Sequence, residues 1–154
     1  RMGARRVYLL NGHGGNDELI RLIAREEAPR TQMTIGAASY WSVAWEGMLG
    51  IDAHTRLGTL PGHAGHFETA LMMALRPDLV VQTEIPVAGS EEIEGSVLPE
   101  GFHGTVSRPR AAAATSGTSD DASRATAAWG EELLDVIVRE VTTGIEAFHR
   151  QAES

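Results

Sequence analysis

The sequence predicts an α/β fold, a three-layer α/β/α arrangement with a mostly parallel central sheet. The first observation is a strand, a helix and a second strand in succession near the start, over residues 6–11, 17–28 and 31–40, with Pro29 and Arg30 expected to end the helix. This order implies a right-handed parallel βαβ unit. The second observation is a final helix over residues 120–150, whose apolar residues recur every three or four positions. Such a single stripe suits a helix that covers a sheet.

The strand over residues 6–11 leads into a glycine-rich turn, residues 11–16, with the sequence Asn-Gly-His-Gly-Gly-Asn. The short apolar run of the strand is typical of a strand covered on both faces. The turn places His13 at the carboxyl end of the strand, where open α/β sheets bind their ligands. We expect the glycines to adopt backbone conformations closed to other residues, so that His13 points into a cleft, and Asn16 to cap the next helix. His13 can be merely structural, but this setting favours a functional role.

Two aromatic residues follow the second strand, which has apolar or small residues on both faces. Tyr40 and Trp41 should therefore lie at the same edge of the sheet as His13. They can serve as hydrophobic packing or as an aromatic wall for a planar substrate. A short helix can follow over residues 42–51. Asp52 and His54, in the next loop, have metal-ligand residue types, but such a pair in a polar loop is usually solvated.

A second candidate site opens the helix that ends before Pro77. His63 lies at the start of this helix, and Glu68 follows in its first or second turn. Helical spacing can turn Glu68 inward among apolar residues, where a carboxylate needs an arginine, backbone donors or a cation as its partner. From the helix alone, a role at the helix dipole or in a salt bridge is favoured.

The downstream half contains a long stretch without periodicity. Residues 78–82 predict a third strand, with three consecutive apolar residues. Residues 83–119 are acidic and interrupted by proline and glycine, which indicates either an ordered loop over the cleft or a disordered segment. Ser119 or Asp120 can cap the final helix, in which Trp129 is expected to lie in the core.

Composition excludes several classes of protein. The chain of 154 residues fits one domain, and its net charge of −8 argues against a nucleic-acid partner. All 13 basic residues are arginine, which excludes a lysine Schiff base and a P-loop. The absence of cysteine excludes a thiol nucleophile and a thiolate zinc site, and makes the cytoplasm the expected compartment. No stretch is apolar and long enough to predict a membrane partner.

Two blocks of the sequence resemble a known family. Residues 11–16 resemble the Asn-Gly-His-Gly-Gly-Asn signature of the creatininase family of metal-dependent amidohydrolases. Residues 63–69, His-Ala-Gly-His-Phe-Glu-Thr, are similar to the His-Ala-Gly-x-x-Glu-Thr block of that family, and residues 117–127 give a weaker third echo. The two strong blocks occur in the right order, and with the echo they cover most of the chain.

The resemblance implies a dinuclear Zn²⁺ or Mn²⁺ centre that hydrolyses a C–N bond in a small cyclic or linear amide. It implies His13 and Glu68 as metal ligands and His63 as the catalytic acid or base, a role for which imidazole is suited by its ordinary pKa near 6.5. The family also forms homo-oligomers, which we expect here by analogy only. The expected substrate-binding residues are Tyr40, Trp41, Gly14, Gly15, Asn16 and His66.

His66 departs from the common form of the motif, in which an acidic residue is frequent at this position. We expect it to be surface-exposed, a substrate contact or an extra ligand, in that order. The family also has further ligands upstream of the first block, in a Glu-x-His pair and a following Asp, and this sequence contains no Glu-x-His.

His13 and one carboxylate cannot complete a catalytic zinc site, which normally has three protein ligands. We therefore expect residues 1–154 to be the carboxyl-terminal part of a single creatininase-like domain, incomplete without an upstream half or a partner chain. Alone, this part should bind metal weakly. Two alternatives remain: a non-catalytic module in which residues 12–16 bind an anion at a helix start, and a structural subunit that completes the site of another chain.

Overall fold

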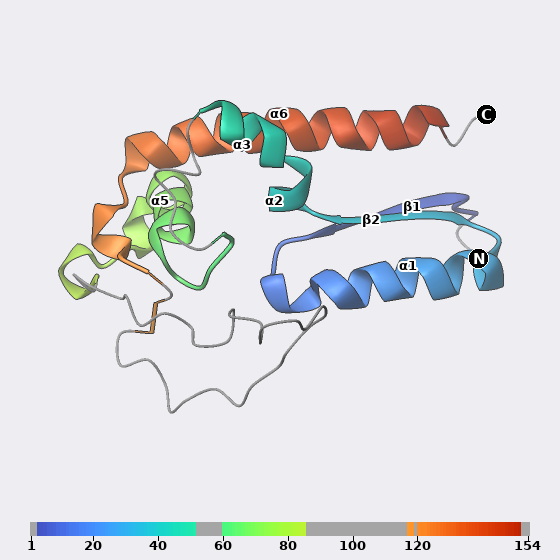
Figure 1. Ribbon diagram of the computed structural model, residues 1–154, viewed down its shortest axis with the longest axis horizontal. Coiled ribbons are helices and arrows are strands. Elements are labelled where there is room, and N and C mark those ends of the chain that lie inside the picture. Colours follow the sequence, from blue (N-terminus) through green and yellow to red (C-terminus); the bar gives the residue numbers. More distant parts are fainter. Residues whose placement is uncertain (1–2, 52–59, 86–116, 119, 152–154) are drawn as a thin grey trace, which may run out of the picture. The chain divides into compact units, whose positions relative to one another are not determined.

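The computed structural model describes residues 3–51, 60–85, 117–118 and 120–151 (Figure 1). The chain forms two compact units, one made of Arg1–His54 with Glu132–Ser154 and the other of Thr55–Glu131. It is a mixed α/β protein whose described part contains one two-stranded parallel sheet. None of the described helices is long and apolar enough to cross a membrane.

The first unit contains the predicted parallel βαβ arrangement. Strand β1 (Arg6–Asn11) is followed by the 3₁₀ helix η1 (Gly14–Asn16), helix α1 (Asp17–Thr31) and strand β2 (Thr34–Ser39). The strands pair in parallel along their whole length, so that Asn11 is opposite Ser39 at their carboxyl ends. This part of the fold prediction is confirmed.

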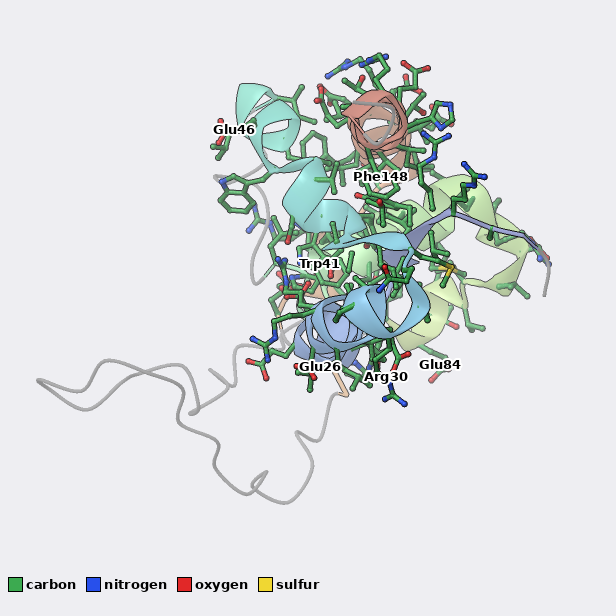
Figure 2. The ribbon with its side chains drawn as sticks, turned by 90° about the vertical axis from the view of Figure 1, so that its right-hand side faces the viewer. Glu26, Arg30, Trp41, Glu46, Glu84 and Phe148 are labelled. Carbon is green, nitrogen blue, oxygen red and sulfur yellow. The ribbon has the colours of Figure 1, made fainter. Side chains whose placement is uncertain are left out.

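Helices lie on both sides of this strand pair within the first unit. Helix α1 lies on one side, and the carboxyl-terminal part of helix α6 (Ala127–Gln151) lies on the other (Figures 1 and 2). On the α6 side, the rings of Tyr8 and Phe148 are 5.3 Å apart. Gly36, the partner of Tyr8 in the sheet, makes room for this contact, since a Cβ atom there would lie 2.9 Å from the Phe148 ring.

Helix α1 runs past the proline that was expected to end it. Pro29 lies inside the last turn, and the helix ends at Thr31 because Gln32 adopts a left-handed conformation with φ 58°. A proline costs a helix one internal hydrogen bond. Side chains satisfy two other carbonyl groups in the last turn: Thr31 Oγ1 donates to Glu27 O (2.6 Å), and Gln32 Nε2 donates to Pro29 O (2.8 Å).

The short helix expected over residues 42–51 is two helices, α2 (Tyr40–Val43) and α3 (Trp45–Gly50). Helix α3 packs tightly against α6, because a Cβ atom at Gly47 would lie 2.8 Å from Val136. Met48 of α3 is buried, with 1% of its surface exposed.

The second unit is built around helix α5 (His66–Leu75) and the start of α6. Phe67 and Ala70 of α5 have no exposed surface, and Trp129 of α6 is 7% exposed, which confirms its predicted place in the core. The two helices approach closely at Gly130, where a Cβ atom would lie 1.9 Å from the carbonyl oxygen of Ala70. The remaining elements of this unit are the 3₁₀ helices η2 (Pro77–Leu79), η3 (Gln82–Glu84) and η4 (Ala122–Arg124).

Two expectations in the second unit are wrong. Residues 78–82 do not form a strand: Pro77 opens η2, and the extended residues Val80 and Val81 join no sheet in the described part of the chain. The final helix begins at Ala127 instead of residue 120, and Thr126 Oγ1 accepts a hydrogen bond from Trp129 N (3.2 Å) as its cap. Most of the long region 83–119 lies outside the described residues.

Candidate functional site

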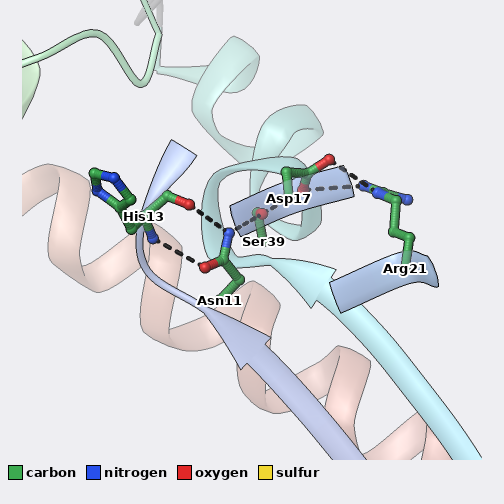
Figure 3. A network of polar contacts seen from close by, with 5 residues as sticks. All are labelled: Asn11, His13, Asp17, Arg21 and Ser39. Carbon is green, nitrogen blue, oxygen red and sulfur yellow. Dashed lines mark hydrogen bonds and ion pairs between the residues drawn. The ribbon is translucent and has the colours of Figure 1, made fainter. Parts of the chain in front are cut away.

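The turn after β1 is held by the side chain of a buried asparagine (Figure 3). Asn11 is 5% exposed. Its Oδ1 atom accepts from His13 N (3.1 Å), and its Nδ2 atom donates to His13 O (2.8 Å). The same carbonyl accepts from Asn16 N (3.0 Å). Both backbone polar groups of His13 are thus fixed, while the residue itself is exposed at the carboxyl edge of the sheet.

The hydrogen bonds continue from Asn11 to the start of α1. Asn11 Nδ2 also donates to Ser39 Oγ (2.8 Å), and the Ser39 hydroxyl, fully buried, donates to the Asp17 carboxylate. Arg21 Nε donates to the same carboxylate at 2.9 Å. Both bonds lower the pKa of Asp17 below its ordinary value, and the bond from Arg21 has the larger effect. Asp17 is therefore held in its charged form.

The glycines of this turn have a different role from the one expected. In the described part of the chain, the glycines with positive φ are Gly3, Gly62 and Gly117, so Gly12, Gly14 and Gly15 adopt ordinary backbone conformations. A Cβ atom at Gly15 would lie 3.3 Å from His13 Nε2. Gly15 thus leaves room for the imidazole.

Asn16 does not cap α1 with its side chain, contrary to expectation. It belongs to η1, with backbone dihedrals in the helical region (φ −99°, ψ −7°). A capping residue normally has extended dihedrals that bring its side chain to the first-turn N–H groups. The start of α1 consequently has no side-chain cap from Asn16.

The two aromatic residues after β2 lie at the expected edge, at the start of α2. Their rings are 5.0 Å apart and nearly perpendicular, at 82°. Trp41 is buried, with 9% of its surface exposed, whereas Tyr40 is half-buried.

The turn before α5 places His63 on the surface, three residues before the helix begins. The turn enters the left-handed region at Gly62 (φ 67°) and at Ala64 (φ 47°), a conformation that is strained for the alanine. Glu68 accepts a hydrogen bond from Ala64 N (2.6 Å), and Thr69 Oγ1 donates to Ala64 O (3.2 Å). The Glu68 carboxylate therefore has a backbone N–H group as one partner. This hydrogen bond stabilises the turn that carries His63.

His66 is 6% exposed, which corrects the expectation of a surface residue. As the first residue of α5 it packs into the second unit, and its backbone N–H donates to Asp120 Oδ1 (2.5 Å). Its Nδ1 atom is buried, and none of the residues that the structure describes forms a hydrogen bond with it. The hydrogen bond of its backbone joins it to a residue 54 positions downstream, a contact that local sequence patterns do not reveal.

The described residues do not complete a metal site. His13 belongs to the first unit and His63 and Glu68 to the second, and no group of three metal-ligand side chains occurs among the residues that the structure describes. Asp52 and His54 lie outside those residues. The exposed imidazole of His13 is suited to be one ligand, but the chain as described does not supply a full set.

The sequence patterns did not reveal the connection from Asn11 through Ser39 to Asp17. A signal for it exists: each strand of an otherwise apolar pair ends in a small polar residue, and the two residues are register partners. Buried polar groups need hydrogen bonds, so two such groups at one sheet edge predict that they bind each other.

A histidine on a glycine-rich turn, at the carboxyl edge of parallel strands, is the arrangement in which α/β proteins commonly bind their ligands. Comparisons with known proteins extend this description. The family model described as creatininase, creatinine amidohydrolase, matches residues 1–145. The chain therefore belongs to the creatininase family.

Individual relatives agree with this assignment. The chain is 30% identical over 142 residues to the mycofactocin precursor peptide peptidase of Mycobacterium ulcerans (strain Agy99), covering 92% of this chain and 48% of that protein. It is 38% identical over 96 residues to the creatinine amidohydrolase of Pseudomonas putida, covering 52% of this chain and 34% of that enzyme. The chain thus spans about half the length, or less, of these curated relatives.

A solved structure of a mutant creatininase complexed with creatine matches with a TM-score of 0.66 and 30% sequence identity. The match covers 95% of this chain and 58% of that one. The α/β arrangement described above is therefore part of the creatininase fold.

Proposed function

We propose that this chain supplies part of the active site of a metal-dependent amidohydrolase, which hydrolyses a C–N bond of a cyclic or linear amide. The observation that carries the proposal is the exposed His13 at the carboxyl edge of the parallel strands, within a chain of the creatininase family. The side chain of Asn11 forms hydrogen bonds with both the N–H and the C=O group of His13, and we call this pair of bonds the Asn11 clamp. A ligand must be held in one geometry to bind a metal well, and the two hydrogen bonds from Asn11 supply this.

In this proposal His13 and Glu68 are metal ligands contributed by the chain. A divalent ion such as Zn²⁺ or Mn²⁺, in a dinuclear centre, would activate water and polarise the amide carbonyl. His13 is exposed and has room beside Gly15. Glu68 already accepts one backbone hydrogen bond, which would orient its carboxylate toward a cation.

His63 is proposed to transfer protons during the reaction. The leaving nitrogen of an amide must gain a proton, and imidazole is the side chain that exchanges protons most readily near neutral pH. His63 is exposed, on a turn that is held by the hydrogen bond from Ala64 N to Glu68, so solvent has access to its imidazole. The proposed substrate-binding residues are Tyr40, Trp41, Gly14, Gly15, Asn16 and His66.

The remaining ligands are proposed to come from protein outside this chain, either an upstream part or a partner. Two observations support this: the chain spans 48% and 34% of its curated relatives, and its described residues contain no group of three metal ligands. The complete domain would then be a three-layer α/β/α fold with a larger parallel sheet, with residues 83–119 over the cleft. A cytoplasmic homo-oligomer is part of the same proposal.

The test is His13→Ala in the complete enzyme, meaning this chain together with the part that supplies the other ligands. We expect loss of bound metal, measured by elemental analysis, and loss of amide hydrolysis of at least about 100-fold, as for removal of a group acting on the metal. The midpoint of urea unfolding should hardly change, because His13 is exposed. His149→Ala, which removes another exposed histidine, is the control. Retained metal and activity in His13→Ala would refute the ligand role.

A non-catalytic anion-binding module, or a structural subunit for another chain, is the second candidate. The observation in its favour is the start of α1, where Asn16 makes no side-chain cap and helix N–H groups attract anions. Calorimetric titration of the chain with Zn²⁺ and with inorganic phosphate separates the candidates. Weak zinc binding that requires His13 supports the enzyme, whereas phosphate binding that is unaffected by His13→Ala supports the module.

A further inference from the structure

We propose that Asp17 is a positioning residue for His13: its negative charge sets the direction of a hydrogen-bond chain through Ser39 and Asn11. The inference rests on the proposed role of His13 as a metal ligand. It goes beyond that role because it assigns the control of His13 to a residue that touches neither the imidazole nor the proposed metal.

The direction of the chain follows from the chemistry of each member (Figure 3). An ionised carboxylate can only accept hydrogen bonds, so the single O–H group of Ser39 must donate its hydrogen bond to Asp17. Ser39 Oγ can then only accept from Asn11, and its partner at 2.8 Å must be the amide NH₂ group. Arg21 keeps Asp17 in the charged form that this order requires.

This direction agrees with the one orientation of the Asn11 amide that the His13 backbone accepts. With Nδ2 toward Ser39 and His13 O, its Oδ1 atom faces the His13 N–H group. The flipped amide would place Oδ1 against the carbonyl oxygen of His13 and NH₂ against its N–H group, so both contacts would be repulsive. Asn11 is 5% exposed and Ser39 is fully buried, so water cannot readily replace the lost bonds.

His13 depends on this clamp because its ring has little other support. The residue is exposed, and in the described part of the chain the imidazole makes no hydrogen bond in the network that holds its backbone. The ring lies beside Gly15, with Nε2 3.3 Å from the position that a Cβ atom would take. A turn that is free to shift would therefore move the ring.

The test compares two variants of the 154-residue chain with a matched control, by NMR. Asp17→Asn keeps the shape of the side chain but can donate as well as accept, so the order of the bonds is no longer imposed by a negative charge. Ser39→Ala breaks the chain at its centre. Asp78→Asn is the control, because Asp78 is another carboxylate held by an arginine (Arg76, 2.6 Å) but is connected to no site residue.

The first measurement uses the metal-free protein: the exchange rate of the His13 backbone amide with solvent and the signals of the Asn11 NH₂ group. We expect exchange to accelerate about three- to tenfold in both test variants, the change that corresponds to loss of one hydrogen bond, and to be unchanged in Asp78→Asn. The amide of Phe67, which lies in the other unit, reports on general unfolding. Unchanged exchange and unchanged Asn11 signals in a folded Asp17→Asn protein would overturn the proposal.

The second measurement adds Mn²⁺ and follows paramagnetic broadening of the His13 ring signals, which also detects weak binding. We expect the test variants to need at least about threefold more Mn²⁺ for equal broadening. If amide exchange becomes faster but the Mn²⁺ concentration needed for equal broadening does not change, the hydrogen-bond chain has only a structural role. That result would overturn the proposal that Asp17 positions His13. Absence of broadening in the unaltered protein would instead refute His13 as a ligand, while the exchange result would still decide the hydrogen-bond chain. Ser39 is buried, so the Ser39→Ala variant can fail to fold. In that case the Asp17→Asn variant alone decides the test.

Discussion

The two turns that carry the candidate site residues are held in different ways. Side-chain hydrogen bonds from Asn11 hold the first, and the helix that follows, α1, buries none of its residues. The second turn enters the left-handed region at Gly62 and Ala64 and leads into α5, half of whose ten residues are buried.

This difference shows that glycine content and backbone strain are separate properties. The turn with three glycines has ordinary dihedrals, whereas the strained one has an alanine at φ 47°. A polar network maintains the first turn, and an apolar helix anchors the second. The two turns should therefore respond to different perturbations.

The largest expected difference concerns the helix that follows each turn. Phe67→Ala removes a side chain without exposed surface, and we expect it to lower the free energy of unfolding by about 3–5 kcal/mol. Leu22→Ala in α1 removes a side chain that is 46% exposed and should cost less than about 1 kcal/mol. Urea unfolding measures both values. Similar costs for the two variants would remove the distinction between a buried and an open helix.

A second prediction tests how tightly the helix after the second turn is packed. Gly130→Ala would place a methyl group 1.9 Å from the Ala70 carbonyl oxygen, and α5 and α6 would have to separate. We expect a cost of about 1–3 kcal/mol in thermal or urea unfolding. The control is Gly50→Ala in α3, where a Cβ atom meets nothing within 4 Å; it should be neutral or stabilising by up to about 1 kcal/mol. Equal effects would show that the α5–α6 contact yields easily.

The smallest expected effect concerns pH and the polar network of the first turn. Because the pKa of Asp17 is lowered in the folded protein by Arg21 and Ser39, its contribution to stability is complete above the unfolded value of about 3.9 and is lost as pH falls through the folded value. Asp17→Asn should thus cost at most about 1 kcal/mol at neutral pH. The difference from the unaltered chain should vanish in acid, as unfolding curves at a series of pH values would show. A difference that persists in acid would contradict this origin.

Local patterns predicted the elements that depend on neighbouring residues. The βαβ unit follows from apolar runs and a turn, and Trp129 from helical periodicity, and both are confirmed. The predicted third strand is wrong because a strand needs a partner, and none pairs with Val80 or Val81 in the described part. Pro29 was expected to end a helix that continues to Thr31.

The site shows the same division between local and distant interactions. The position of His13 at the strand end follows from its neighbours in sequence, since the strand stops at Asn11. By contrast, Asn11 Nδ2 donates to Ser39, 28 positions later, and the backbone N–H of His66 donates to Asp120, 54 positions later. Such contacts form only when the chain is folded, so they could not be read from spacing.

The Asn11 clamp also makes the turn sensitive to chemical ageing. Asn11 precedes Gly12, and asparagine is among the thermally labile residues of proteins. Loss of ammonia from its side chain would leave a carboxylate, which has no hydrogen to donate. Both bonds from Nδ2 would be lost, those to His13 O and to Ser39, and a negative charge would face the charged Asp17 across one hydroxyl group. Deamidation at this one position would therefore release the turn without any change to the encoded sequence.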